Sequence, residues 1–161
     1  MATSWSPLDD ALRAYRRGDR DAVLLMRTDV GGTEEVPVAL FFRAPEEMGP
    51  VEAAALELAR GRILDLGSGP GAHAVPMLQR GLAVTAVEIL PEARAALRDA
   101  GVEDVRSDVG ALGPEERFDT VLALMNGLGL CASIRLRTQD RVGQVIVVEK
   151  SDVISSSKFH R

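Results

Sequence analysis

Cysteine and histidine are scarce in this chain of 161 residues, and long apolar runs are missing. The single cysteine, Cys131, cannot form an internal disulfide, and with only two histidines beside it a structural zinc site is not expected. No apolar run approaches the roughly 20 residues of a membrane-spanning helix. The first residues also lack the charged and then apolar segments of a signal peptide. These absences predict a soluble cytoplasmic protein with no metal centre and no membrane partner.

Lysine is missing from the first 149 residues, where every basic side chain is an arginine. The net charge is −5, so the chain lacks the basic surface that nucleic-acid binding requires, and a small molecule is the expected partner. The charge changes along the chain. Residues 1–130 carry 13 bases and 21 acids, which gives −8, whereas residues 131–161 carry 6 bases and 3 acids, which gives +3.

A glycine-rich segment is the centre of the sequence pattern. Residues 63–66 form a short apolar run that predicts a buried strand, and Gly67, Gly69 and Gly71 follow it at alternate positions. A strand, a glycine loop and a helix form the nucleotide-binding unit of parallel α/β sheets. Glycines suit the loop because a side chain would hold the ligand away from the backbone.

Strands and helices alternate on both sides of this segment, which is typical of a parallel sheet with right-handed crossovers. The first predicted helix begins at residue 6 and ends before Gly18. The other predicted helices cover residues 50–60, 72–80 and 91–100. The predicted strands of the sheet cover 63–66, 83–87, 102–105, 118–124 and 144–148. Residues 23–26 and 36–42 predict a hairpin. We therefore expect an N-terminal helical and hairpin cap (1–60), a Rossmann-like core (61–149) and a flexible tail (150–161).

Acidic residues follow three successive predicted strands. Ligands of such sheets bind beyond the carboxyl ends of the strands, next to the first one, so Asp65, Glu88 and Asp108 are expected to face one crevice. Glu88 lies 21 residues after Gly67, the interval at which a carboxylate accepts hydrogen bonds from two ribose hydroxyls. A carboxylate at Asp65 would repel a pyrophosphate, so it favours a cationic or hydroxyl-rich ligand.

Four motifs in this order resemble the class I S-adenosylmethionine-dependent methyltransferases, over about residues 61–129. They are Asp65-x-Gly67-x-Gly69-x-Gly71, Val84-Thr85-Ala86-Val87-Glu88, Asp108, and Phe118-Asp119-Thr120-Val121-Leu122. The resemblance implies a mostly parallel α/β sheet with helices on both faces. About five of the family's seven strands are present here, and the N-terminal helix and hairpin are an extension.

The resemblance also implies S-adenosyl-L-methionine as the cofactor and assigns residues to it. In the family pattern Asp65 holds the methionine ammonium group and Glu88 the ribose hydroxyls, while Asp108 accepts a hydrogen bond from the adenine amino group. The full set of cofactor-binding candidates is Asp65, Gly67, Ser68, Gly69, Gly71, Glu88, Ile89, Asp108, Val109 and Met125.

The sequence indicates less clearly which residues bind the methyl acceptor. The reason is that methyl transfer from a sulfonium needs alignment and exclusion of water more than an acid–base pair. Asn126 and His73 are the catalytic candidates, and Phe42, Arg43 and Asn126 are the substrate candidates. A histidine in a first helical turn is more often a local hydrogen-bond partner, and Phe42 equally fits the core of a covering flap. Asn126 is followed by glycine and leucine instead of two prolines, so methylation of a nucleobase amine or glutamine amide is not supported.

Other interpretations stay open at this stage. The spacing of Gly67, Gly69 and Ala72 also fits an NAD(P)-dependent oxidoreductase. A non-catalytic cofactor-binding or scaffold remnant is another alternative, because few residues follow the fifth predicted strand. The shortening could reflect a genuinely shorter architecture, a truncated or frame-shifted end after about residue 130, or an internal deletion before residue 143. An unpaired fifth strand would offer an edge for a homodimer.

Overall fold

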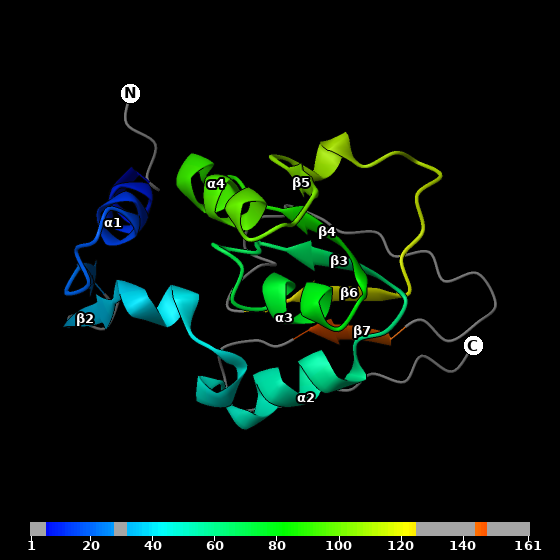
Figure 1. The fold of residues 1–161 in the computed structure, drawn as a ribbon, viewed down its shortest axis with the longest axis horizontal. Helices are drawn as coiled ribbons and strands as arrows, with labels where there is room; N and C mark the ends of the chain where they lie inside the picture. Colours follow the sequence, from blue (N-terminus) through cyan, green and yellow to red (C-terminus); the bar gives the residue numbers. More distant parts are fainter. Residues whose placement is uncertain (1–5, 28–31, 125–143, 148–161) are drawn as a thin grey trace.

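The computed structural model describes residues 6–27, 32–124 and 144–147, and its centre is a parallel five-stranded sheet (Figure 1). The strand order is β5-β4-β3-β6-β7. The chain therefore adds β4 and β5 on one side of β3 and then β6 and β7 on its other side. This confirms the predicted Rossmann-like α/β fold, with β7 at one edge among the described strands. The strands are β3 (Arg62–Leu66), β4 (Ala83–Val87), β5 (Asp104–Arg106), β6 (Thr120–Ala123) and β7 (Gln144–Val147).

Side chains alternate along the strands and build a different apolar cluster on each face of the sheet. On one face Ile63 and Leu122 pack with the helices α2 (Pro50–Leu58), α3 (Ala74–Gln79) and α4 (Pro91–Asp99). The other face holds Leu64, Leu66, Val87 and Ala123. Residues of the segment between β5 and β6 pack there, and that segment contains only the short 3-10 helix η3 (Val109–Ala111).

The described helices of the core therefore cover one face of the sheet. Helices on the second face stay a prediction, and residues 125–143 lie outside the described ranges. The predicted boundary at residue 60 stays a prediction, although α2 packs on the sheet with α3. None of the helices in the described part of the chain is long and apolar enough to cross a membrane.

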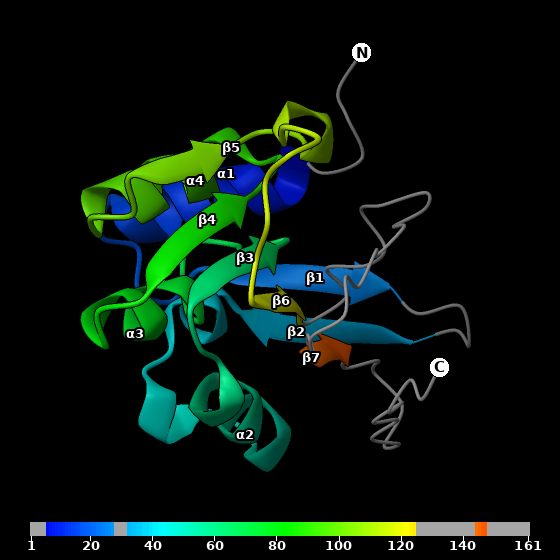
Figure 2. The same cartoon turned by 90° about the vertical axis from the view of Figure 1, so that its right-hand side faces the viewer.

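The N-terminal elements form a cap beside the ends of β3 and β4 (Figures 1 and 2). They are α1 (Ser6–Arg16), β1 (Val23–Arg27), β2 (Thr33–Pro37) and the 3-10 helices η1 (Val38–Phe42) and η2 (Pro45–Glu47). A hairpin is confirmed, with its strands at residues 23–27 and 33–37, which pair antiparallel. The predicted second strand, 36–42, is wrong in its bounds: the ladder ends where Val23 pairs with Pro37, and residues 38–42 form η1, in which Val38 is buried and Leu40 is exposed.

Ion pairs and aromatic packing attach this cap to α4. Asp9 accepts a hydrogen bond from the Glu92 N–H (2.8 Å), and Arg16 pairs with Glu92 and Asp99. Tyr15 stacks on Phe42 with ring centroids 4.8 Å apart. The cluster around Leu12 and Val38 includes Leu90 and Ala93 at the start of α4. The cap is thus fastened next to the carboxyl end of β4, where the sequence places the ligand.

Candidate functional site

The glycine loop joins β3 to α3, and its conformation depends on three glycines with positive φ. Gly67, Gly69 and Gly71 have φ of 70°, 56° and 114°. A Cβ at Gly71 would lie 2.9 Å from Val75, so this glycine is needed for packing within the protein. A Cβ at Gly69 would meet no atom within 4 Å. That open space lies where the sequence expects the ligand to approach the backbone.

Asp65 is the most buried acid of the site. Its side chain lies on the face of the sheet that carries α2 and α3, is 1% exposed, and its Oδ2 is the only fully buried side-chain polar atom without a hydrogen-bond partner among the described residues. Burial raises the pKa of Asp65 to about 6, and His73 opposes this rise more than any other neighbour. A buried carboxylate oxygen without a partner is costly, so the site favours a cationic donor.

Glu88 follows β4 and ties the glycine loop to the next strand. Its Oε2 accepts the Gly69 N–H (2.7 Å) and its Oε1 accepts the Leu90 N–H (2.8 Å). Burial raises the pKa of Glu88, although these two backbone donors oppose the shift. An ionised carboxylate has about four acceptor positions, so each oxygen can still accept a hydroxyl donor.

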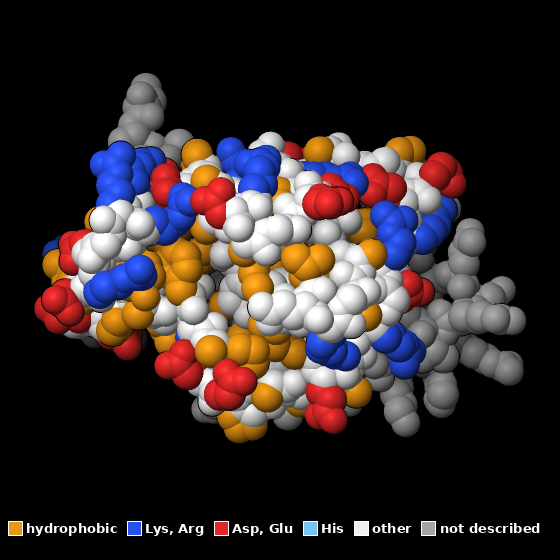
Figure 3. Space-filling model, in the orientation of Figure 1, with side chains coloured by type: hydrophobic (Ala, Val, Ile, Leu, Met, Phe, Trp, Pro, Cys, Tyr) orange, Lys and Arg blue, Asp and Glu red, His pale blue; other side chains and the backbone are white. Residues whose placement is uncertain are grey.

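Two apolar side chains are exposed in the segments that follow β4 and β5. Ile89 follows β4 and Val109 opens η3 after β5, and they are 38% and 37% exposed. Asp108 precedes Val109 and accepts the Gly110 N–H with its Oδ1. Figure 3 shows further apolar side chains on the molecular face between the N-terminal cap and the sheet. Exposed apolar groups beside a hydrogen-bonding carboxylate suit a flat aromatic base attached to a sugar.

A second polar cluster lies beside Asp65 and consists of Arg43, Glu52 and His73. Nε2 of His73 is 2.7 Å from Oε1 of Glu52, and Arg43 pairs with the same oxygen. All three come from different segments: the end of η1, the first turn of α2 and the turn before α3. Burial would raise the pKa of Glu52, but the hydrogen bond with His73 and the charge of Arg43 outweigh it, and the pKa lies below its ordinary value.

The structure brings together most of the predicted residues. Asp65, the glycine loop and Glu88 converge at the carboxyl ends of β3 and β4, as the sequence predicted. Arg43 lies in the second cluster. Phe42 packs in the core of the cap, and a contact of Phe42 with a substrate stays a prediction. Met125 and Asn126 lie outside the described residues. Glu52 was missed by the sequence analysis, although it is a carboxylate in the first turn of a predicted helix.

The comparisons with known proteins point to one kind of enzyme. A family model described as a methyltransferase domain matches residues 64–128. An S-adenosylmethionine-dependent methyltransferase from Bacteroides fragilis, solved with S-adenosyl-L-homocysteine, is 30% identical with a TM-score of 0.68. That match covers 79% of this chain and 53% of the other, so the chain spans about half the length of this relative.

Two other solved structures match with lower TM-scores. The glycopeptide N-methyltransferase MtfA, in complex with S-adenosylmethionine, is 25% identical with a TM-score of 0.34, over 47% of this chain and 40% of the other. The sugar N-methyltransferase KedS8 from Streptoalloteichus sp is 22% identical with a TM-score of 0.38, over 60% and 42%. No curated protein matches the sequence.

Proposed function

We propose that this chain, which belongs to the class I S-adenosylmethionine-dependent methyltransferase family, binds S-adenosyl-L-methionine at the carboxyl ends of β3 and β4 and transfers its methyl group to a small-molecule acceptor. The observation that carries the proposal is the buried Oδ2 of Asp65, which has no partner among the described residues and lies beside the glycine loop. The cationic ammonium group of the cofactor's methionine part would supply that partner.

The remaining residues of the site fit the other parts of the cofactor. Glu88 accepts from the ribose hydroxyls while its hydrogen bonds to Gly69 and Leu90 hold the carboxylate in place. Ile89 and Val109 pack against the adenine ring, and Asp108 accepts a hydrogen bond from its amino group. The open space at Gly69 admits the ligand close to the backbone.

The bound cofactor would supply a methyl group on a cationic sulfonium, and the residues of this chain would hold that group in position. The three anchoring carboxylates fix the cofactor along the ends of β3, β4 and β5, which leaves little freedom for the reacting carbon. Holding the reactants in line can account for several kcal/mol of barrier reduction without an acid–base pair.

The oxidoreductase alternative lacks support from either the comparisons or the charges. A dinucleotide would bring a pyrophosphate to the loop beside the buried carboxyl group of Asp65, and like charges in such a site repel strongly. A non-catalytic cofactor-binding protein would keep the same anchoring residues, so only turnover distinguishes it from a transferase.

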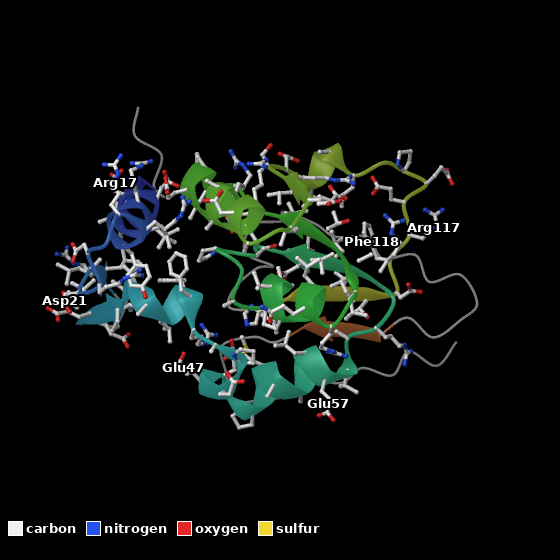
Figure 4. All side chains as sticks on the ribbon, in the orientation of Figure 1. Arg17, Asp21, Glu47, Glu57, Arg117 and Phe118 are labelled. Carbon is white, nitrogen blue, oxygen red and sulfur yellow. The ribbon has the colours of Figure 1, made fainter. Side chains whose placement is uncertain are left out.

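Calorimetric titration tests the cofactor site. Wild-type protein is expected to bind S-adenosylmethionine and S-adenosylhomocysteine but not NAD. Glu88→Gln, which keeps the size of the side chain but removes its charge, is expected to weaken both adenosyl ligands about tenfold. Glu57→Gln is the matched control, because Glu57 lies on the outer side of α2 away from the sheet (Figure 4).

Two outcomes would overturn the proposal. Binding of NAD by a protein that ignores both adenosyl ligands would favour the dinucleotide interpretation. A folded sample that binds none of the three ligands would show that the site is not a cofactor site, and a scaffold role would then be the better explanation.

A further inference from the structure

The amino-acid end of the proposed cofactor carries two charges that cannot be separated. Its ammonium and carboxylate groups are attached to the same carbon atom. If Asp65 takes the ammonium, the carboxylate must therefore lie next to Asp65, in a region that already holds Glu88 and Glu52. A third anion there would be repelled unless a positively charged donor faces it.

His73 is the residue in the right place to be that donor. It directly precedes α3, on the face of the sheet toward which Asp65 projects, and it is 6% exposed. Of the side chains that influence the pKa of Asp65 electrostatically, His73 lowers it and Glu88 raises it. Ser68, the other polar neighbour, donates its hydroxyl to the Asp65 carbonyl oxygen (2.9 Å).

Glu52 determines how the imidazole of His73 is held. The 2.7 Å contact between Nε2 and an ionised carboxylate keeps a proton on that nitrogen. Nδ1 has no hydrogen bond to any residue in the described part of the chain. An imidazolium has two N–H donors, so His73 can donate to Glu52 with one and to a second anion with the other.

The other charged groups of the cluster already have partners. Arg43 pairs with Glu52, and Glu88 accepts the Gly69 and Leu90 N–H groups. The ammonium group would be the partner of Asp65. The Nδ1 of His73 is therefore the ring nitrogen left to donate to the cofactor's carboxylate.

We infer that His73 is a further cofactor-binding residue that donates to the carboxylate of the methionine part, and that Glu52 is the positioning residue that orients it. The inference rests on the proposed function and extends it to the amino-acid end of the cofactor. It changes the interpretation of His73 from a catalytic candidate to a residue that anchors the cofactor at the opposite side of the amino acid from Asp65.

Three ligands separate this role from a purely structural one. S-adenosylhomocysteine has the carboxylate and the ammonium group, its decarboxylated analogue keeps only the ammonium group, and 5′-methylthioadenosine has neither. Wild-type protein is expected to bind S-adenosylhomocysteine about tenfold more tightly than the decarboxylated analogue. In His73→Gln and Glu52→Gln this preference is expected to fall to about twofold or less, while affinity for methylthioadenosine stays unchanged.

Glu47→Gln is the matched control for Glu52→Gln. Each glutamate accepts a backbone N–H three residues earlier in the chain, Ala44 for Glu47 (2.9 Å) and Gly49 for Glu52 (3.3 Å), and glutamine can keep that hydrogen bond. Glu47 is the last residue of η2 and lies at the surface (Figure 4). Its variant should retain the full preference for S-adenosylhomocysteine.

The outcomes distinguish this inference from the proposed function. If wild-type protein binds all adenosyl ligands but does not prefer the carboxylate, or if both variants weaken the three ligands equally, the inference is wrong and His73 is structural. If no adenosyl ligand binds to the wild type, the proposed function itself fails. The wild-type comparison needs no substitution, so a variant that does not fold leaves the test intact.

Discussion

Asp65→Asn is expected to weaken binding of S-adenosylhomocysteine at least about 30-fold and to stabilise the ligand-free protein at pH 8. The loss of affinity follows from removing one partner of a buried charge pair, which typically costs about 2–5 kcal/mol. The gain in stability follows because the ionised carboxylate is buried with an unpartnered oxygen. The ionised carboxylate favours ligand binding but disfavours folding. Removing its charge therefore weakens binding and raises the free energy of unfolding.

The direction of the pH dependence follows from the raised pKa. The pKa of Asp65 is about 6 in the folded protein, whereas 3.8 is the ordinary value, so between these the folded state holds a proton that the unfolded state has released. The free energy of unfolding therefore falls as the pH rises from about 4 through 6, by at most about 3 kcal/mol from this group. Asparagine removes that part of the pH dependence, and we expect a gain of about 1–3 kcal/mol at pH 8.

Urea denaturation at pH 5 and pH 8, with calorimetry for the ligand, measures both effects. Asp10→Asn is the control, because Asp10 is exposed and its ion pair with Arg13 is on the surface of α1. The affinity of the wild type for S-adenosylhomocysteine should increase as the pH rises through about 6, since the ammonium group needs the ionised form. An Asp65→Asn protein that keeps its affinity and loses stability at pH 8 would contradict this account.

Local patterns were enough to predict β3, β4 and the loop between β3 and α3. The apolar run 63–66 can only be a short buried strand when glycines follow at once, and Glu88 is placed by its distance from Gly67 along the chain. Both signals lie within one βαβ unit, so the spacing fixes which atoms meet. The structure confirms this arrangement through the hydrogen bond from Gly69 to Glu88.

The second cluster could not be predicted in the same way, because its members meet only after the cap and the core are assembled. Glu52 is 21 residues from His73 and belongs to a different helix, and nothing in the spacing connects them. The turn of residues 38–42 into η1 has a similar cause. These apolar residues fit a strand by composition, but beyond the Val23–Pro37 pair only the Val38 N–H continues the pairing, to the Ala22 carbonyl oxygen (2.9 Å). Val38 then packs in the cluster around Leu12.

Gly61→Ala is expected to reduce the free energy of unfolding by about 3 kcal/mol or more, the largest effect on stability that we predict. Gly61 precedes β3 with φ of +66°, and a Cβ there would overlap the carboxylate of Asp119. That carboxylate accepts the Arg62 N–H (2.7 Å), while the Asp119 N–H donates to the Arg62 carbonyl oxygen (2.8 Å). An alanine must therefore adopt a left-handed conformation and also displace the contact that joins the start of β3 to β6.

Gly81→Ala separates these two costs. Gly81 also has a positive φ, +82°, but a Cβ there would meet no atom within 4 Å. Only the conformational cost of about 1–2 kcal/mol remains, so the difference between the two variants in urea denaturation measures the displacement of Asp119. In an Asp119→Gly background, which also removes the Asp119 Cβ 2.7 Å from the added carbon, Gly61→Ala should cost no more than Gly81→Ala does. Equal losses for the two single variants would contradict the overlap.

Gly61→Ala is expected to leave the proposed cofactor site intact. Gly61 lies at the amino end of β3 and Asp65 near its carboxyl end, so the strand separates the Asp119 contact from the proposed cofactor site. The folded fraction of Gly61→Ala should bind S-adenosylhomocysteine with the wild-type affinity, and saturating ligand should restore part of its stability by mass action. Asp65→Asn should gain less stability from the same ligand concentration, because in that variant the missing charge weakens the binding that would stabilise the fold.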